Sequence, residues 1–187
     1  MSLMEVCAVG LAVVYVLLAV YQKRLCWIAA IASAALYIVI FWQVQLYLEA
    51  ALQVFYIAMA VYGWFAWSRP PDSGQIIRTW PLRHHVVACL LLLTLSLVTG
   101  ATMNAFTDAA SPFIDAATTV SALLATWMVA NKLLENWIYW IAIDITSVGL
   151  YLSRDLTLTA ILFVGYVVLA GWGYFTWRKQ WTNQLSA

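Results

Sequence analysis

The sequence predicts an all-α membrane protein with seven transmembrane helices, built as two parallel three-helix repeats joined by a linker helix. Three observations predict this fold: the composition, the number of long apolar segments and an internal repeat. Of the 187 residues, 65% are hydrophobic and 9% are charged, and the mean hydropathy is +0.88. Soluble domains carry about 25% charged residues. Too little polar surface remains to cover a globule in water, so lipid has to solvate much of the chain.

Seven apolar segments are long enough to cross the hydrocarbon core of a bilayer, about 30 Å, as helices. They cover residues 4–20, 25–42, 48–67, 86–103, 113–130, 136–152 and 157–177. Backbone polar groups in lipid must be paired within the segment, which favours an α-helix for each. Pro70, Pro71, Pro81 and Pro112 all fall in connections or at a helix start, as expected of a residue that breaks helix interiors.

An internal repeat pairs aromatic and glycine residues at one constant offset of 110 positions. Tyr56, Gly63 and Trp67 recur as Tyr166, Gly173 and Trp177, and Trp27 recurs as Trp137. The repeat divides the chain into a first three-helix repeat (1–67), a cytoplasmic connection with linker helix 86–103 (68–112), and a second three-helix repeat (113–187). Because the linker makes the number of intervening crossings even, both repeats cross the membrane in the same direction. Parallel repeats are a transporter architecture, with the substrate near the midplane between the halves.

The basic residues predict the orientation. Eight of the nine Lys and Arg residues collect on one side, and only Arg154 falls on the other. The positive-inside rule therefore places the N-terminus outside and the C-terminus in the cytoplasm. Five tryptophans near the inner helix ends are typical of an aromatic belt: Trp64, Trp67, Trp137, Trp140 and Trp177.

Several classes of function are disfavoured. A net charge of +1 argues against a nucleic-acid partner, which requires a concentrated basic face. The chain has no G-x-S-x-G, H-E-x-x-H or Walker motif, so no enzyme is indicated. Cys7, Cys26 and Cys89 stand alone in apolar runs, which is typical of small core residues. We expect neither a cofactor nor a metal.

Asp144 is the most informative polar residue. It lies eight residues past Asn136, about 12 Å along a helix that rises 1.5 Å per residue, and therefore near the middle of the membrane. A carboxyl group is costly there unless it faces a cavity or has a partner. It is either the counter-charge of a cationic substrate or a structural, hydrogen-bonded group. Asn136, Trp140 and Asp144 recur at i, i+4 and i+8, on one face of the helix.

Other helices supply further candidates. Gln53, Tyr56 and Trp64 follow one another at helical spacing on the third helix, where a glutamine serves either a ligand or a neighbouring helix. Trp127 on the fifth helix either stacks on a substrate ring or packs in the core. Lys132 and Glu135 are i, i+3 neighbours, which is more typical of a salt bridge than of a binding site.

The chain resembles the Pnu-type vitamin transporters in three stretches: FWQVQLY from Phe41, LQVFYIAMAVYGWFAWSR from Leu52, and KLLENWIYWIAIDITS from Lys132. This family includes nicotinamide riboside carriers and thiamine carriers, and its plan is similar to that of the SWEET sugar transporters. The resemblance implies facilitated diffusion by alternating access across the bacterial inner membrane, followed by trapping of the vitamin by a cytoplasmic kinase. A homo-oligomer is left open. The pocket positions that the resemblance implies are Gln53, Tyr56, Trp127, Asn136, Trp140 and Asp144.

The expected substrate is a cationic vitamin. Nicotinamide riboside carriers of this family have Asn near the position of Ser33 and at the position of Asp144, and this chain departs from both. The fixed cation and the aminopyrimidine of thiamine suit an ionised Asp144 together with Gln53 and Asn136, so thiamine is favoured. Nicotinamide riboside is the alternative because it is also a fixed cation. A membrane-embedded enzyme and a purely structural protein are more remote.

Overall fold

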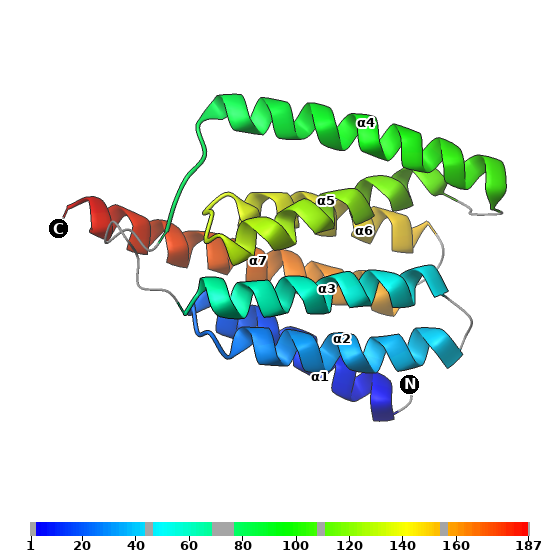
Figure 1. Ribbon diagram of the computed structural model, residues 1–187, viewed down its shortest axis with the longest axis horizontal. Helices are drawn as coiled ribbons and strands as arrows, with labels where there is room; N and C mark the ends of the chain where they lie inside the picture. The colour runs from blue at the N-terminus through cyan, green and yellow to red at the C-terminus, as the bar shows by residue number, and fades with distance from the viewer. Residues whose placement is uncertain (1–2, 44–46, 69–76, 108–110, 154–156, 187) are drawn as a thin grey trace.

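The computed structural model describes residues 3–43, 47–68, 77–107, 111–153 and 157–186 (Figure 1). These residues form seven α-helices and no named strand, which confirms the predicted all-α fold. The helices are α1 Leu3–Val20, α2 Cys26–Gln43, α3 Tyr47–Ala66, α4 Leu82–Phe106, α5 Pro112–Ala130, α6 Asn136–Leu152 and α7 Thr157–Leu185.

Most of the helices have the length and surface of membrane spans. Within the described residues, α1, α2, α4, α5 and α7 are long and apolar enough to cross a bilayer, while Ala50–Ala66 of α3 is a shorter apolar helix. On α4, leucines and valines are exposed along most of its length, among them Leu90, Leu93 and Val98. Such a surface suits lipid and not water.

Two helices extend well beyond the apolar segments that predicted them. Helix α4 begins at Leu82, and α7 continues to Leu185, past the expected end at residue 177. The added part of α7 is polar, so hydropathy could not reveal it. The Gln184 side chain binds this part of α7 to the Ile77 backbone. Its Oε1 accepts a hydrogen bond from the Ile77 N–H at 2.9 Å, and its Nε2 donates one to the Ile77 carbonyl at 3.0 Å.

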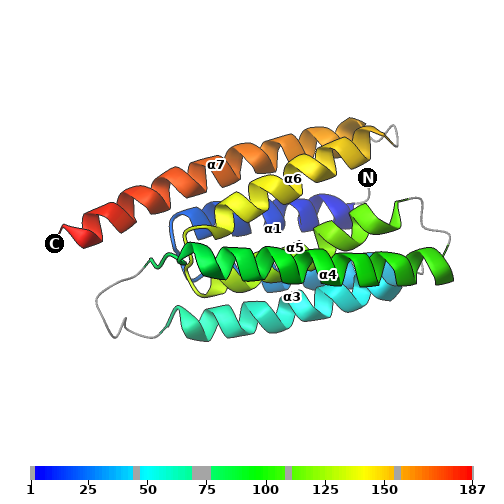
Figure 2. The same ribbon diagram turned by 90° about the horizontal axis from the view of Figure 1, so that it is seen from above.

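The helices form two groups, α1–α3 and α5–α7, with α4 packed on α5 at the edge of the bundle (Figure 1; Figure 2). The two groups meet where α3 contacts α5 and where α1 contacts α7. The N- and C-termini lie at opposite ends of the long axis (Figure 1). The division into repeats 1–67 and 113–187 around the connection 68–112 stays a prediction.

Both groups contain the same local turn. Two residues after the ends of α1 and α5 lies a residue in the left-handed conformation, Gln22 and Lys132, each with a φ of 53°. The next N–H groups reach back to close a Schellman-type turn, Lys23 to the Leu18 carbonyl at 2.9 Å and Leu133 to the Met128 carbonyl at 3.0 Å. Gln22 and Lys132 are 110 positions apart, the offset of the sequence repeat.

The orientation is a prediction that topology reporters can check. We expect green fluorescent protein fused after Ala187 to fluoresce and alkaline phosphatase at the same site to be inactive, because the positive-inside rule places that end in the cytoplasm. The complementary fusions before Leu3 serve as the control and should give the opposite pattern. Phosphatase activity at the C-terminus would reject this orientation.

Candidate functional site

Two adjoining cavities lie between the two helix groups. The larger has a volume of about 460 Å³ and the smaller about 240 Å³. Ala12, Tyr15, Trp140 and Phe163 line both cavities and form their common wall. Together the cavities reach the size range of small-molecule binding sites, about 300–1,000 Å³.

The larger cavity carries most of the neutral polar groups. Gln53, Tyr56, Tyr37, Ser33 and Thr126 line it from α2, α3 and α5. The Ser33 hydroxyl donates to the Ala8 carbonyl at 2.9 Å, and the Thr126 hydroxyl donates to the Ala122 carbonyl at 2.7 Å. These two oxygens therefore keep only acceptor capacity, while the Gln53 amide offers both donors and an acceptor. This arrangement can bind the hydroxyl groups of a polar solute.

The smaller cavity combines one carboxylate with aromatic rings. Asp144 is 5% exposed and lines it together with Trp140 and Tyr166. Within the described part of the chain, Asp144 makes no hydrogen bond or ion pair. A buried carboxylate without a partner is costly, and aromatic faces attract cations. The cavity is therefore suited to a flat cationic ring.

Four of the seven predicted site residues line the cavities. Gln53 and Tyr56 line the larger cavity, Asp144 lines the smaller one, and Trp140 lines both. They come from α3 and α6, which belong to different helix groups. The structure thus brings together, between the groups, residues that are far apart in the sequence.

The other three predicted residues, Trp64, Trp127 and Asn136, do not line either cavity. The Arg24 guanidinium lies 3.9 Å from the centre of the Trp64 ring. Trp127 is 38% exposed and packs against Trp80 with ring centroids 5.8 Å apart.

Asn136 is fully buried at the start of α6. Its Nδ2 donates to the Leu133 carbonyl at 2.6 Å, and its Oδ1 has no partner among the described residues. Asn136 and Trp64 both lie away from the two cavities for the same reason. A residue at i+8 is displaced by about 12 Å along a helix axis and rotated by about 80° around it, so eight-residue spacing does not keep a side chain in one pocket.

Sequence reasoning missed aromatic residues that α1, α2 and α7 contribute. Tyr15, Phe163 and Tyr166 line the smaller cavity, and Tyr37 lines the larger one. One signal was available, because Tyr166 is the repeat partner of Tyr56. Adding the offset of 110 to the number of the candidate residue Tyr56 would have identified Tyr166 as a further candidate.

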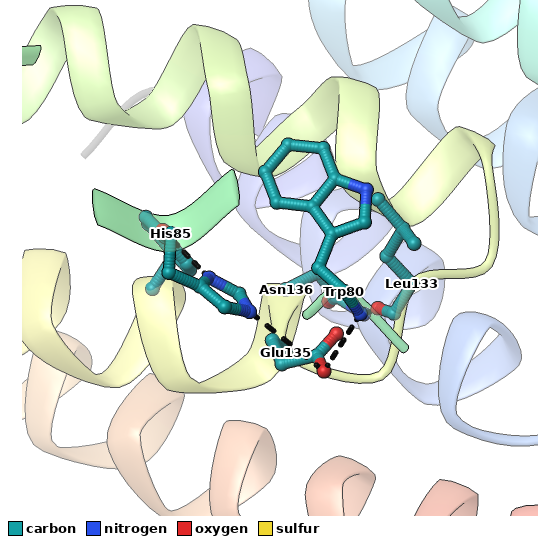
Figure 3. A network of polar contacts seen from close by, with 6 residues as sticks. Trp80, His85, Leu133, Glu135 and Asn136 are labelled. Carbon is teal, nitrogen blue, oxygen red and sulfur yellow. Dashed lines mark hydrogen bonds and ion pairs between the residues drawn. The ribbon is translucent and has the colours of Figure 1, made fainter. Parts of the chain in front are cut away.

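A polar network joins the connection after α3 to the start of α6 (Figure 3). The Arg78 N–H donates to the Lys132 carbonyl at 3.0 Å, and the Leu134 N–H donates to the Arg78 carbonyl at 2.8 Å. The Trp80 N–H donates to Glu135 Oε1 at 3.1 Å, and His85 Nε2 lies 3.8 Å from the same oxygen. Glu135 therefore positions the connection against α6.

The predicted salt bridge between Lys132 and Glu135 is wrong for the described residues. Lys132 Nζ instead lies 4.9 Å from the centre of the Trp67 ring, and burial lowers the pKa of Lys132. The backbone turn at Lys132 explains the difference, because its positive φ breaks the helical spacing on which an i, i+3 pair depends.

The aromatic-belt interpretation is also wrong for two of the five tryptophans. Trp177 is fully buried and Trp137 is 3% exposed. Both belong to a core cluster that also contains Trp27 and Ala60. They pack between helices and do not face the membrane interface.

Comparisons with known proteins identify relatives along most of the chain. A family model described as nicotinamide mononucleotide transporter matches residues 2–179. The nicotinamide riboside transporter PnuC of Escherichia coli (strain K12) is 26% identical over 174 residues, which cover 78% of this chain and 72% of the relative. The riboflavin/roseoflavin transporter RibM of Streptomyces davaonensis is 26% identical over 136 residues, which cover 69% of this chain and 63% of the relative.

One solved structure shares the fold. The crystal structure of the vitamin B3 transporter PnuC matches with a TM-score of 0.73 and 19% sequence identity, covering 97% of this chain and 83% of that chain. This match confirms the predicted fold class.

Proposed function

The chain belongs to the nicotinamide mononucleotide transporter family, and from that premise we propose that its substrate is nicotinamide riboside. Membership makes it a multi-pass membrane vitamin transporter and not an enzyme, as the resemblance to the Pnu-type family predicted. The observation that carries the choice of substrate is the pairing of an aromatic, carboxylate-bearing cavity with a larger polar one.

The two cavities suit the two halves of nicotinamide riboside. The pyridinium ring is a permanent cation, so it fits beside Asp144 and Trp140 in the smaller cavity. The ribose carries several hydroxyl groups, which fit Gln53, Tyr56 and Thr126 in the larger cavity. Trp140 lies between the two positions because it lines both cavities.

The relatives support nicotinamide riboside over thiamine, the substrate that the sequence favoured. They are named for nicotinamide riboside and for riboflavin and roseoflavin, so they support the alternative substrate. Thiamine has a cationic ring but no ribose, so it makes less use of the polar groups around Gln53. Riboflavin is neutral and leaves the Asp144 carboxylate without a counter-charge.

The charge of the cavities also favours the riboside over its phosphorylated form. Of the residues that the structure describes, no Lys or Arg lines either cavity. A phosphate group taken into them would lose its hydration without gaining an ion pair. We therefore propose uptake of the unphosphorylated vitamin by facilitated diffusion across the bacterial inner membrane, with a cytoplasmic kinase trapping the product.

A panel of ligands tests this proposal by isothermal titration calorimetry on the purified, lipid-reconstituted protein. We expect nicotinamide riboside to bind more tightly than thiamine and riboflavin, and nicotinamide mononucleotide to bind at least about ten-fold more weakly, a difference of about 1.4 kcal/mol. Nicotinamide, which lacks both the ribose and the charge, is the control and should bind weakly. Tightest binding of thiamine or riboflavin would contradict the assignment.

A further inference from the structure

Four tryptophans form a continuous layer at one end of the two cavities. Trp27 lines the larger cavity, and Trp137 lines the smaller one. Trp67 packs edge-on against Trp27 with ring centroids 5.2 Å apart, and Trp177 packs edge-on against Trp137 at 5.4 Å. The Trp67 and Trp177 rings pack at a tilt of 54°, with their centroids 6.3 Å apart. The layer therefore separates both cavities from the end of the bundle that carries the turns after α1 and α5.

The two central tryptophans make reciprocal hydrogen bonds between the helix groups. Trp67 Nε1 on the connection after α3 donates to the Ala130 carbonyl at the end of α5, at 3.0 Å. Trp177 Nε1 on α7 donates to the Val20 and Ala19 carbonyls at the end of α1, at 3.1 and 3.2 Å. The Trp67–Ala130 and Trp177–Val20 bonds correspond to each other, because their donors and their acceptors are 110 positions apart.

The Val20 and Ala130 carbonyls can accept the indole hydrogen bonds because of the turns that follow α1 and α5. A Schellman-type turn pairs two carbonyls of the last helical turn with the N–H groups that follow, and leaves other carbonyls of that turn unpaired. Here the pairs involve Leu18 and Ala19 in α1, and Met128 and Val129 in α5. The indole of the opposite helix group donates to the next carbonyl, Val20 or Ala130, and the Trp177 indole shares its N–H with Ala19 as well. Each of these bonds joins a helix end to the other half of the protein.

The Trp27 and Trp137 rings are tightly packed, but their N–H groups lack hydrogen-bond partners among the described residues. A Cβ atom added to Gly63 would lie 2.4 Å from the Trp27 ring, and one added to Gly173 would lie 2.7 Å from the Trp137 ring. The Nε1 atoms of Trp27 and Trp137 are buried and have no hydrogen-bond partner in the described ranges. Leaving buried donors unpaired destabilises this closed arrangement. The layer is therefore well packed, but its two unpaired N–H groups lower the stability of the closed arrangement.

We propose that Trp67 and Trp177 are the gate on this side of the substrate cavities, and that it opens when the indole–carbonyl bonds of both tryptophans break. The bonds lie at the two contacts between the helix groups, α3 with α5 and α1 with α7. A movement that opens a path from the cavities through this end has to separate them. The proposal rests on the transport function, but it concerns the gate and not the identity of the substrate.

A native cysteine reports on the state of the gate. Cys26 is fully buried at the start of α2, next to Trp27, whereas Cys7 and Cys89 are exposed. In a Cys7→Ser, Cys89→Ser background, N-ethylmaleimide therefore labels Cys26 when the layer opens. The labelling rate measures the open population without any ligand, so failure of the substrate assignment would leave this test intact.

The test compares Trp67→Phe and Trp177→Phe in that background. Phenylalanine keeps an aromatic ring, including a face for Lys132, but cannot donate to the carbonyl. We expect each substitution to raise the Cys26 labelling rate by about two-fold to ten-fold, the effect of losing one hydrogen bond, and the double variant to raise it further. Affinity for nicotinamide riboside should change less than the labelling rate does.

The matched control is Trp172→Phe, which changes an exposed tryptophan of α7 that packs on Tyr21 at 5.5 Å. It should leave the labelling rate unchanged. Equal labelling of the parent and the folded Trp67→Phe, Trp177→Phe protein would overturn the proposal, and so would an equal increase in the control. Should Trp177→Phe fail to fold, Trp67→Phe provides the same test, because Trp67 is only half-buried.

Discussion

Asp144→Asn is expected to weaken binding of nicotinamide riboside by about one to two decades, which is about 1.4 to 2.8 kcal/mol. The substitution keeps the shape and hydrogen-bonding capacity of the side chain but removes its charge. Opposite charges about 4 Å apart attract by about 4 kcal/mol at an effective dielectric of about 20, and desolvation cancels part of that attraction. Calorimetry of the parent and variant proteins measures the difference.

The reduced form of nicotinamide riboside is the matched ligand for this experiment. Its dihydropyridine ring has nearly the same shape but no charge, so its affinity should change much less in Asp144→Asn. Because Asp144 makes no hydrogen bond or ion pair within the described ranges, and a buried charge without a partner is costly, the variant should be at least as thermally stable as the parent. Equal losses for the two ligands, or a less stable protein that binds both normally, would show that Asp144 is a structural residue.

Gly173→Ala is expected to lower the free energy of unfolding by about 1–3 kcal/mol, as overpacking of a filled core does. The added methyl group would lie 2.7 Å from the Trp137 ring, which is itself buried and packed on Trp177. The same reasoning applies to Gly63→Ala, whose methyl group would lie 2.4 Å from Trp27. Unfolding in mixed detergent micelles measures both effects.

Gly171→Ala is the control because it lies two residues away on the same helix. An added Cβ there has no neighbour within 4 Å, so only helix propensity changes. Alanine is favoured over glycine in a helix by about 1 kcal/mol, and the variant should be as stable as the parent or more stable. Equal behaviour of the two alanine variants would contradict the proposed packing of Trp137 against Gly173.

Much of the fold could be predicted from the sequence because lipid imposes a simple rule. A segment that crosses the bilayer has to be apolar, helical and about 20 residues long. At the end of the bundle opposite the turns after α1 and α5, six of the seven helix ends therefore lie within one residue of their expected positions. The rule does not apply beyond the membrane. It could not predict that α7 continues to Leu185, since Gln184 is held there by the Ile77 backbone.

The candidate site was predictable where one residue was both polar and deep in the membrane. Asp144 and Gln53 satisfy that condition, and Trp140 and Tyr56 lie one turn or less from them along α6 and α3. Trp127 and Trp64 could not be placed, because an aromatic residue in a membrane helix has no preferred side. Only the tertiary contacts with Trp80 and Arg24 show where they point.

The internal repeat relates more features of the two helix groups than their predicted direction across the membrane. It served to predict parallel halves, but the same offset also relates the turns at Gln22 and Lys132 and the ring contacts of Gly63 and Gly173. The shared turns could not be derived from sequence matches, because Gln22 and Lys132 differ in type. Their shared backbone conformation is a property of the fold.

Uptake of labelled nicotinamide riboside into liposomes tests the central claim most directly. The purified protein, reconstituted without ATP and without any ion gradient, should equilibrate the vitamin across the membrane, and unlabelled nicotinamide riboside inside the liposomes should accelerate entry of the label by exchange. Asp144→Asn liposomes should take it up much more slowly at the same low concentration. Uptake that requires a proton or sodium gradient, or that is seen for thiamine or riboflavin but not for nicotinamide riboside, would contradict the account.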